Sequence, residues 1–312
     1  MIGGRHYLSN DVKLISVREV YKSFGNIIAL DGLSLDVEPG IFGLIGPNGA
    51  GKTTLIQILV GLVYAEKGRG QIFGLDIVDN SVSIRRRLGV LHERPAFPKH
   101  MKVQEYLNRV AGIYHSTYSS SKLLSKVGLA DAEERRIGDL SAGMHQRLGI
   151  AQALIGNPEL VILDEPTSNL DVIGRDDILT LIVQLYNEDD ISFFISSHVL
   201  SELERVCHSI AFIKEGQVVE KGSVIDIVKK HSVGLYKIVT SDAQKVGMIL
   251  DNMSSVSKVY IVGANTITVR MATDRIKDVQ SEILQLAESR GIKVYEIEET
   301  QSLDEIFRRV IG

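Results

Sequence analysis

The segment from Gly46 to Thr54 carries the residue types and spacing that most directly specify a chemistry. It reads Gly-Pro-Asn-Gly-Ala-Gly-Lys-Thr-Thr, which matches the pattern of a loop that binds phosphate groups. An apolar run precedes it and a helix-forming segment follows it, as such a loop requires. Glycines let backbone N–H groups curve around phosphate oxygens, and the start of the next helix adds partial positive charge. We therefore expect a nucleotide-binding site here; the alternative is a glycine-rich turn that matches by chance.

Two residues of this loop have separate expected roles. The Lys52 amine would reach the β- and γ-phosphates, and the Thr53 hydroxyl would bind Mg²⁺. Lys52 is therefore a candidate catalytic residue and Thr53 a candidate metal ligand. The residues expected to contact the nucleotide are Gly46, Pro47, Asn48, Gly49, Ala50, Gly51, Lys52, Thr53 and Thr54.

A pair of carboxylates, Asp164 and Glu165, follows the apolar run Leu160–Leu163. If this run is a buried parallel strand, the pair lies at the carboxyl edge of the sheet, where ligands bind in open α/β folds. Asp164 would hold Mg²⁺ and Glu165 would polarise the attacking water. An acidic pair alone can be a solvated strand end, but its distance from Lys52, more than a hundred residues, leaves room for an inserted helical block.

That block contains Leu140-Ser141-Ala142-Gly143-Met144, and at this point the sequence resembles the ATP-binding subunits of ABC transporters. The family signature is Leu-Ser-Gly-Gly-Gln at the start of a helix, so Ala142 and Met144 depart from it. The resemblance implies that Ser141 and Gly143 contact the γ-phosphate of ATP. Without the family, the segment is an ordinary capped helix start.

Other landmarks of the family appear in the expected order. Asp171 ends a segment that resembles the D-loop, and His198 corresponds to the histidine that contacts the γ-phosphate. Phe24 corresponds to the aromatic residue that stacks on adenine. Glu93 stands where the family usually has the glutamine of the Q-loop, and the resemblance makes it a third candidate Mg²⁺ ligand beside Thr53 and Asp164. The catalytic residues it implies are Glu165, His198 and Lys52.

Strand and helix patterns alternate over residues 12–230 and must position these groups. Strands are expected at Val12–Val20, Ile27–Val37, Ile41–Ile45, Gly70–Leu75, Leu88–Leu91, Leu160–Leu163, Ile191–Ile195, Ser209–Ile213 and Gln217–Glu220. Helices are expected from the phosphate loop to near Gly61 and at Ser81–Arg87, Val103–Tyr114, Ser120–Val127, Ser141–Ile155, Val172–Tyr186 and Val199–Val206. With the resemblance, the fold class is α/β: a P-loop NTPase of ABC type over residues 1–230, with a helical subdomain at about 94–157.

Residues 231–312 form a second expected domain with the order β-α-β-β-α-β and a tail helix. This order is typical of a small α+β, ferredoxin-like unit. Its elements are expected at Leu235–Thr240, Gln244–Met253, Lys258–Val262, Thr266–Met271, Asp274–Arg290, Ile292–Glu298 and Ser302–Val310. The segment from Ser302 to Phe307 resembles the C-terminal extension of exporter-type subunits.

Composition excludes several other classes of protein. The net charge is −4, so a nucleic-acid partner is not expected. The single cysteine, Cys207, allows no disulfide within the chain and is expected to be a packed apolar side chain. No apolar run reaches the ~18–20 residues that a membrane-spanning helix needs. We expect the chain to be soluble by itself, so that a partner supplies any membrane span.

The resemblance implies a subunit that binds and hydrolyses ATP with Mg²⁺ and drives a separate integral-membrane permease. Two copies would pair head to tail, with each ATP between the phosphate loop of one and the signature of the other. The chain would lie on the cytoplasmic face of the cell membrane, and Glu93 and the chain's ending favour export. Two alternatives remain open: an ABC-type ATPase that regulates ribosomes or DNA, and a nucleotide-binding regulator whose C-terminal unit senses a small ligand.

Overall fold

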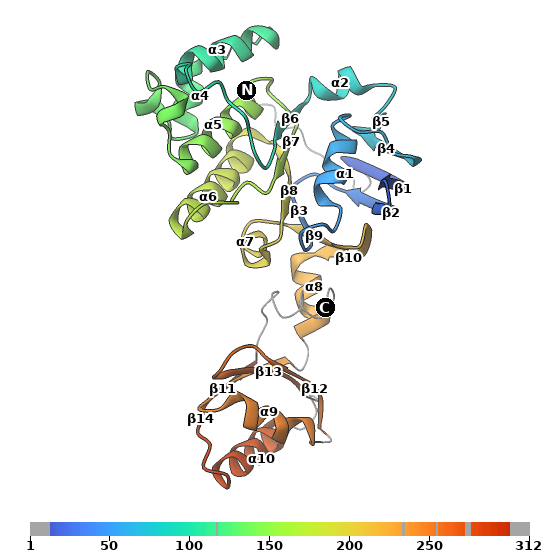
Figure 1. Cartoon of the computed structure of the whole chain (residues 1–312), viewed down its shortest axis with the longest axis vertical. Helices are drawn as coiled ribbons and strands as arrows, with labels where there is room; N and C mark the ends of the chain where they lie inside the picture. The colour runs from blue at the N-terminus through green and yellow to red at the C-terminus, as the bar shows by residue number, and fades with distance from the viewer. Residues whose placement is uncertain (1–12, 117, 233–234, 254, 272–275, 300–312) are drawn as a thin grey trace. The chain divides into compact units, whose positions relative to one another are not determined.

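The computed structural model describes residues 13–116, 118–232, 235–253, 255–271 and 276–299. Contacts between Cα atoms divide the chain into two compact units that meet between Ser223 and Val224 (Figure 1). The expected boundary after residue 230 falls inside helix α8 (Val224–Ser232), which belongs to the second unit. No helix of the described residues is both long and apolar enough to cross a membrane.

A six-stranded sheet with the order β10-β9-β3-β8-β7-β6 forms the centre of the first unit. Its strands are β3 (Ile41–Ile45), β6 (Leu88–Leu91), β7 (Leu160–Asp164), β8 (Ser192–Ser197), β9 (Ser209–Lys214) and β10 (Gln217–Ser223). All neighbouring pairs are parallel except β9 and β10. Strands β3, β7 and β8 are buried along their whole length, as expected for parallel strands covered on both faces.

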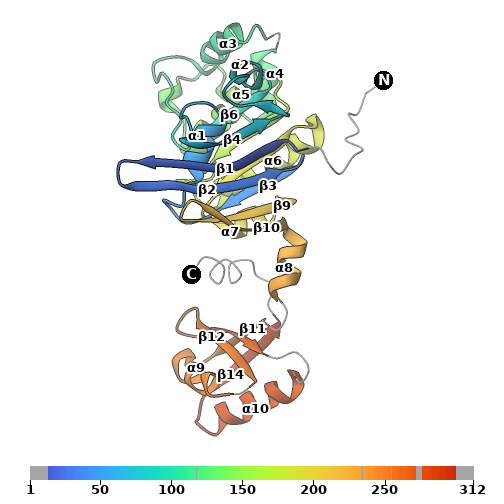
Figure 2. The same ribbon diagram turned by 90° about the vertical axis from the view of Figure 1, so that its right-hand side faces the viewer.

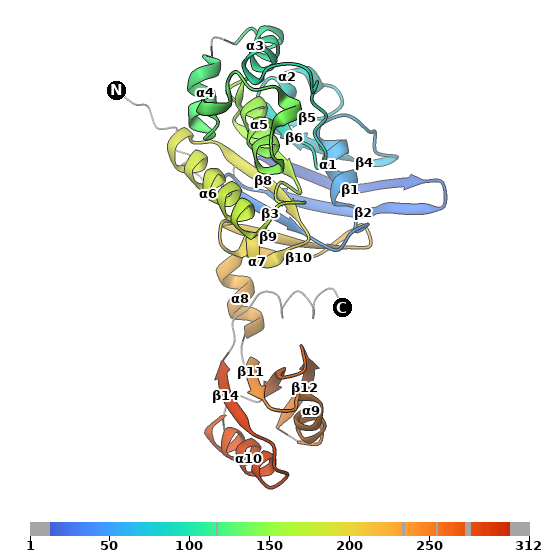
Figure 3. The same ribbon diagram turned by 60° about the vertical axis from the view of Figure 1, so that its left-hand side comes forward.

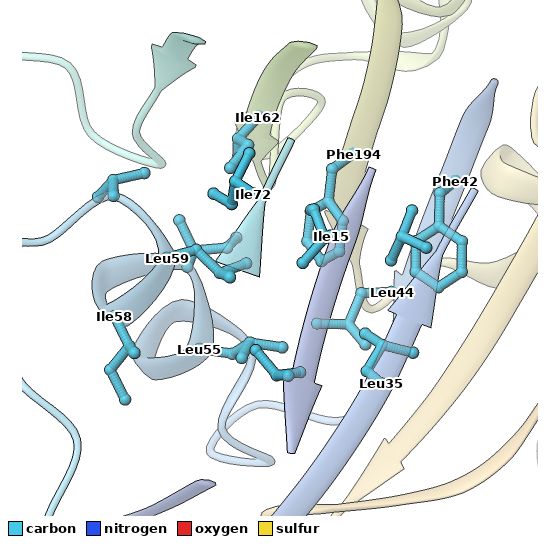
Figure 4. Packing of buried hydrophobic residues seen from close by; sticks show 14 of the residues in the cluster. Ile15, Leu35, Phe42, Leu44, Leu55, Ile58, Leu59, Ile72, Ile162 and Phe194 are labelled. Carbon is cyan, nitrogen blue, oxygen red and sulfur yellow. The ribbon is translucent and has the colours of Figure 1, made fainter. Parts of the chain in front are cut away.

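A second, antiparallel sheet with the order β2-β1-β4-β5 covers helix α1 (Lys52–Leu59) from the other side. Its strands are β1 (Ile15–Phe24), β2 (Ile27–Val37), β4 (Lys67–Ile72) and β5 (Leu75–Asp76). The largest core cluster joins α1 to both sheets, and Figure 4 shows Leu55 and Leu59 of α1 among side chains such as Ile15 of β1 and Phe194 of β8. This packing fixes the direction in which the phosphate loop enters α1.

The helical block lies between β6 and β7 in the sequence, and its helices gather at the end of the unit opposite β9 and β10 (Figures 2 and 3). Its helices are α3 (Val103–Ile113), α4 (Ser120–Lys126) and α5 (Ala142–Leu154), with short 3₁₀ turns at Ala130–Ala132 and Ile137–Asp139. Helix α5 packs directly on β6, because a Cβ at Gly89 would lie 2.3 Å from the carbonyl oxygen of Ala153. The other helices of the unit are α2 (Ser81–Arg85), α6 (Val172–Asp189) and α7 (Leu200–Glu204).

The second unit contains an antiparallel sheet with the order β12-β13-β11-β14 and its own apolar core. After α8 its elements are β11 (Leu235–Thr240), α9 (Ala243–Asp251), β12 (Val256–Ile261), β13 (Thr266–Met271), α10 (Ile276–Glu288) and β14 (Val294–Glu299). Their order is the β-α-β-β-α-β order expected from the sequence. The expected tail helix at Ser302–Val310 lies outside the described residues.

Some boundaries differ from the sequence expectation for identifiable reasons. Helix α6 runs to Asp189 rather than Tyr186, because its last turn is polar and breaks the apolar period on which the expectation relied. Strand β1 continues to Phe24 rather than ending at Val20, because it pairs with β2 up to the contact between Phe24 and Ile27. Helix α8 and strand β5 were not expected at all.

Candidate functional site

The phosphate loop connects β3 to α1 and is closely packed beneath its glycines. Gly51 precedes α1 with a φ of 105°, and Gly49 has a φ of 82°, a region that favours glycine. A Cβ at Gly51 would lie 2.4 Å from the carbonyl oxygen of Ala29, and one at Gly46 would lie 2.4 Å from that of Ile213. The loop therefore needs glycine at both pattern positions, first for packing against β2 and β9.

Lys52 lies at the first turn of α1 and is 5% exposed. Its Nζ donates to the carbonyl oxygen of Gly46 at 2.7 Å and to that of Pro47 at 3.2 Å. The same Nζ lies 3.2 Å from Oε1 of Glu165. The lysine that is expected to bind phosphates is thus held by oxygens of its own loop and by the candidate base.

The two carboxylates lie at the carboxyl end of β7, where the strand register aligns Asp164 with Ser196 of β8. Asp164 is 1% exposed, and its Oδ1 accepts a hydrogen bond of 2.6 Å from the Ser196 hydroxyl. Glu165 is 6% exposed and has a φ of 49°, so its backbone adopts the left-handed conformation. Its N–H donates to both the Oγ and the carbonyl oxygen of Ser196, at 3.0 Å and 3.2 Å.

His198 directly follows β8 and reaches the same carboxylate. Its Nδ1 lies 2.8 Å from Oε2 of Glu165, and its side chain is 46% exposed. Glu165 is therefore placed between an amine and an imidazole, one on each carboxylate oxygen. Lys52, Asp164, Glu165 and His198 form a polar cluster at one edge of the sheet, as the sequence predicts for ligands of a parallel sheet.

This cluster has the donors that a small hard cation prefers. Asp164 uses one carboxylate oxygen for Ser196, and no printed hydrogen bond among the described residues occupies the other. Thr53, next to Lys52, is exposed, so its hydroxyl can face a ligand. No group of three or more His, Cys, Asp or Glu side chains that could hold a metal occurs in the described part of the chain. The donor set thus fits Mg²⁺ bound mainly through hydroxyl, water and phosphate oxygens, which is how proteins usually bind it.

The expected signature and D-loop residues cap two helices. The exposed Ser141 precedes α5 and accepts a hydrogen bond of 3.3 Å from the N–H of Met144. A Cβ at Gly143 would meet no atom within 4 Å, so the start of α5 is open to an external group. Asp171 precedes α6 and accepts from the N–H of Gly174 at 2.9 Å. Among the described residues, no hydrogen bond or ion pair joins Ser141 or Asp171 to the cluster around Glu165.

Two further expected residues also lie apart from the cluster's contacts. Phe24 ends β1, is 48% exposed, and has the Lys22 amine 5.2 Å from its ring centroid. Glu93 lies two residues beyond β6, the strand that pairs with β7, and so lies toward the same sheet edge as Asp164. The carboxylate of Glu93, however, lies 3.7 Å from Nε of Arg94 and its side chain is 41% exposed.

Ser196 and Glu202 have site contacts that sequence reasoning missed. Glu202 of α7 is 8% exposed, accepts a hydrogen bond of 2.5 Å from the Thr167 hydroxyl, and pairs with Arg175 at 3.2 Å. It thereby ties the segment after Glu165 to α6 and α7. The available signal for Ser196 was a polar pair, Ser196-Ser197, at the end of an apolar strand.

Comparison with protein families and curated proteins gives consistent matches. Residues 30–168 match the family model described as "ABC transporter". The bacitracin transport ATP-binding protein BcrA of Bacillus licheniformis is 34% identical over 304 residues, which cover 96% of this chain and 97% of that protein. The lantibiotic transport ATP-binding protein SrtF of Streptococcus pyogenes is 36% identical over 66% of this chain and 89% of its own length.

Solved structures give the same picture of the fold. A structure of an ATP-binding subunit of an ABC transporter aligns with a TM-score of 0.61 and 26% identity over 70% of this chain and 92% of that chain. A dimeric ATP-binding cassette bound to ADP and phosphate aligns with a TM-score of 0.60 and 23% identity, over 67% of this chain and 98% of that chain. The chain thus contains the fold of an ATP-binding cassette.

Proposed function

The chain belongs to the ATP-binding subunits of ABC transporters and is an ATPase of that family, and on this premise we propose that two copies of it hydrolyse ATP between them to drive a separate membrane permease. The observation that carries the proposal is the cluster of Lys52, Asp164, Glu165 and His198 at the edge where the phosphate loop begins α1. These groups supply a cation for phosphate, a metal ligand, a base and a residue that orients the base.

The first proposed step exchanges the partners of Lys52. When ATP binds, its phosphate oxygens replace the carbonyl oxygens of Gly46 and Pro47 and the carboxylate of Glu165 around the Lys52 amine. Backbone N–H groups of the loop from Gly46 to Thr54 and the start of α1 surround the phosphates. Phe24 stacks on adenine in this proposal.

The second proposed step is hydrolysis with Glu165 as base. The released Glu165 carboxylate accepts a proton from a water whose oxygen forms a bond to the γ-phosphorus, while the bond from that phosphorus to ADP breaks. His198, already 2.8 Å from Glu165, keeps the carboxylate oriented. We propose that the Thr53 hydroxyl, Asp164 and Glu93 hold Mg²⁺, which when bound neutralises phosphate charge.

The site is proposed to be completed by a second copy of the chain. Ser141 and Gly143 lie at an open helix start, which is suited to bind a phosphate group, but they have no contact with the cluster in their own chain. The dimeric form of the cassette structure with ADP and phosphate supports pairing. In the pair, Ser141, Gly143 and Asp171 of one copy face the ATP held by the phosphate loop of the other.

The partner is proposed to be an integral-membrane permease, with the chain on the cytoplasmic face of the cell membrane and export as the direction of transport. Relatives described as bacitracin and lantibiotic transport ATP-binding proteins support a peptide-like antibiotic as the transported class. The second unit, with the sheet order β12-β13-β11-β14, is proposed to be a ferredoxin-like accessory domain.

Sedimentation of the Glu165→Gln chain tests the proposed pairing. Because this change removes the base but leaves the phosphate site, we expect MgATP to convert the chain from monomer to dimer. The double variant Lys52→Ala, Glu165→Gln is the control and should stay monomeric. A Glu165→Gln chain that remains monomeric at saturating MgATP would contradict the proposal.

A further inference from the structure

The Ser196 hydroxyl lies between the two carboxylate residues of the cluster and has no role in the steps above. Ser196 is fully buried, at 0% exposure, on β8 next to β7. Its Oγ lies 2.6 Å from Oδ1 of Asp164 and 3.0 Å from the backbone nitrogen of Glu165. One side-chain atom thus contacts both the candidate metal ligand and the residue of the candidate base.

The donor and acceptor roles of this hydroxyl are fixed by its partners. The backbone N–H of Glu165 can only donate, so Oγ of Ser196 must accept from it. The single hydroxyl hydrogen is then left for Oδ1 of Asp164, which holds that oxygen and turns the other carboxylate oxygen away from Ser196. A hydrogen bond to a charged, buried acceptor is among the stronger ones in proteins.

The backbone of Glu165 needs such an anchor. Its φ of 49° lies in the left-handed region, which disfavours side chains other than glycine. Both acceptors of its N–H, the Oγ and the carbonyl oxygen, belong to Ser196. This conformation sends the Glu165 side chain to the Lys52 amine and to His198, which follows Ser196 by two residues on the same strand.

We propose that Ser196 is a positioning residue for ATP hydrolysis, whose hydroxyl fixes the metal-binding carboxylate of Asp164 and the backbone of Glu165 relative to each other. Ser196 does not touch the reacting atoms; it acts through these two residues. The inference rests on the roles proposed above for Asp164 and Glu165.

The Ser196→Ala variant removes both contacts of the hydroxyl and tests the proposal. We expect the turnover number to fall about tenfold or more and the Mg²⁺ concentration for half-maximal hydrolysis to rise by a similar factor, because a hydrogen bond to a charged group is lost. ADP affinity without Mg²⁺ should stay within about twofold, since the phosphate loop is not altered. A merely structural loss would lower the midpoint of unfolding but would not move the Mg²⁺ curve.

Ser192→Ala is the matched control on the same strand. Ser192 is also buried, at 8% exposure, and its hydroxyl accepts one hydrogen bond of 3.1 Å from the N–H of Gly40, at the opposite end of β8 from His198. We expect Ser192→Ala to keep the wild-type Mg²⁺ curve even if it unfolds earlier. A wild-type Mg²⁺ curve and turnover in Ser196→Ala would overturn the proposal.

A second pair of variants decides the matter if Ser196→Ala does not fold. Thr and Val have nearly the same volume, so Ser196→Thr and Ser196→Val differ mainly by the hydroxyl. The Thr variant should be the more active and should need less Mg²⁺; equal turnover and equal Mg²⁺ curves would overturn the proposal. Glu165→Gln is measured alongside, because wild-type turnover in that variant would instead remove the assignment of the base.

Discussion

The ion pair between Lys52 and Glu165 makes a specific prediction about nucleotide affinity. Because Glu165 competes with the nucleotide for the Lys52 amine, Glu165→Gln should bind nucleotide more tightly than the wild type while hydrolysing it far more slowly. Loss of a general base lowers turnover by about a hundred- to ten-thousandfold. A base that only hydrolyses would show the second effect without the first.

The distance between the two charges sets the size of the affinity change. At 3.2 Å, and with an effective dielectric constant of about 20, two unit charges attract by about 5 kcal/mol. Both groups are buried, so the cost of removing them from water offsets most of this attraction. If about 1.4 kcal/mol remains to be overcome when nucleotide binds, the Gln variant should bind about tenfold more tightly.

Calorimetric titration with MgADP measures this effect without ATP-driven pairing of two copies. Glu159→Gln is the matched control, because Glu159 lies at the opposite end of β7 and its carboxylate accepts two hydrogen bonds from Arg87, at 2.7 Å and 2.8 Å. The control should bind MgADP as the wild type does. Unchanged or weaker MgADP binding by Glu165→Gln would refute the idea that the pair opposes nucleotide binding.

Three further predictions follow from other parts of the chain. Glu93→Gln should keep nucleotide binding but raise the Mg²⁺ concentration for half-maximal hydrolysis, because a carboxylate binds Mg²⁺ more strongly than an amide; superimposable Mg²⁺ titrations would leave Glu93 as a partner of Arg94 only. A chain that ends at Ser223 should fold and bind ATP, since it contains the whole first unit; a folded truncation that does not bind ATP would contradict this. Burial raises the pKa of the Cys207 thiol well above its usual range, so iodoacetamide should label it at pH 8 only after unfolding; rapid labelling of the folded chain would contradict this.

The sequence predicted the elements whose residue types are restrictive. Glycines at 46 and 51 fit only where backbone atoms of Ile213 and Ala29 come close, and the apolar run before Asp164 becomes a fully buried strand. Such patterns follow from local sterics and from burial, which a sequence displays directly. The order of strands and helices in the second unit was predicted for the same reason.

What the sequence could not show depends on contacts between distant segments. The partners of Lys52 and Glu165 come from different strand ends, and either charge alone gives no sign of which oppositely charged group it will meet. Ser196 is an ordinary serine until the register of β7 and β8 sets it opposite Asp164. Helix α8 was missed because its residues were assigned to a linker between two domains, whereas the division lies before it.

The central claim, a site shared by two copies, is tested most directly by mixing two inactive variants. Lys52→Ala disables the phosphate loop, and Ser141→Arg obstructs the exposed start of α5, so neither variant alone should hydrolyse ATP. In a symmetric pair that contains one of each, one of the two sites has an intact loop and an intact helix start. With random pairing of equal amounts, we expect the mixture to recover about a quarter of the wild-type rate. A mixture no more active than the sum of its two components would contradict the shared site.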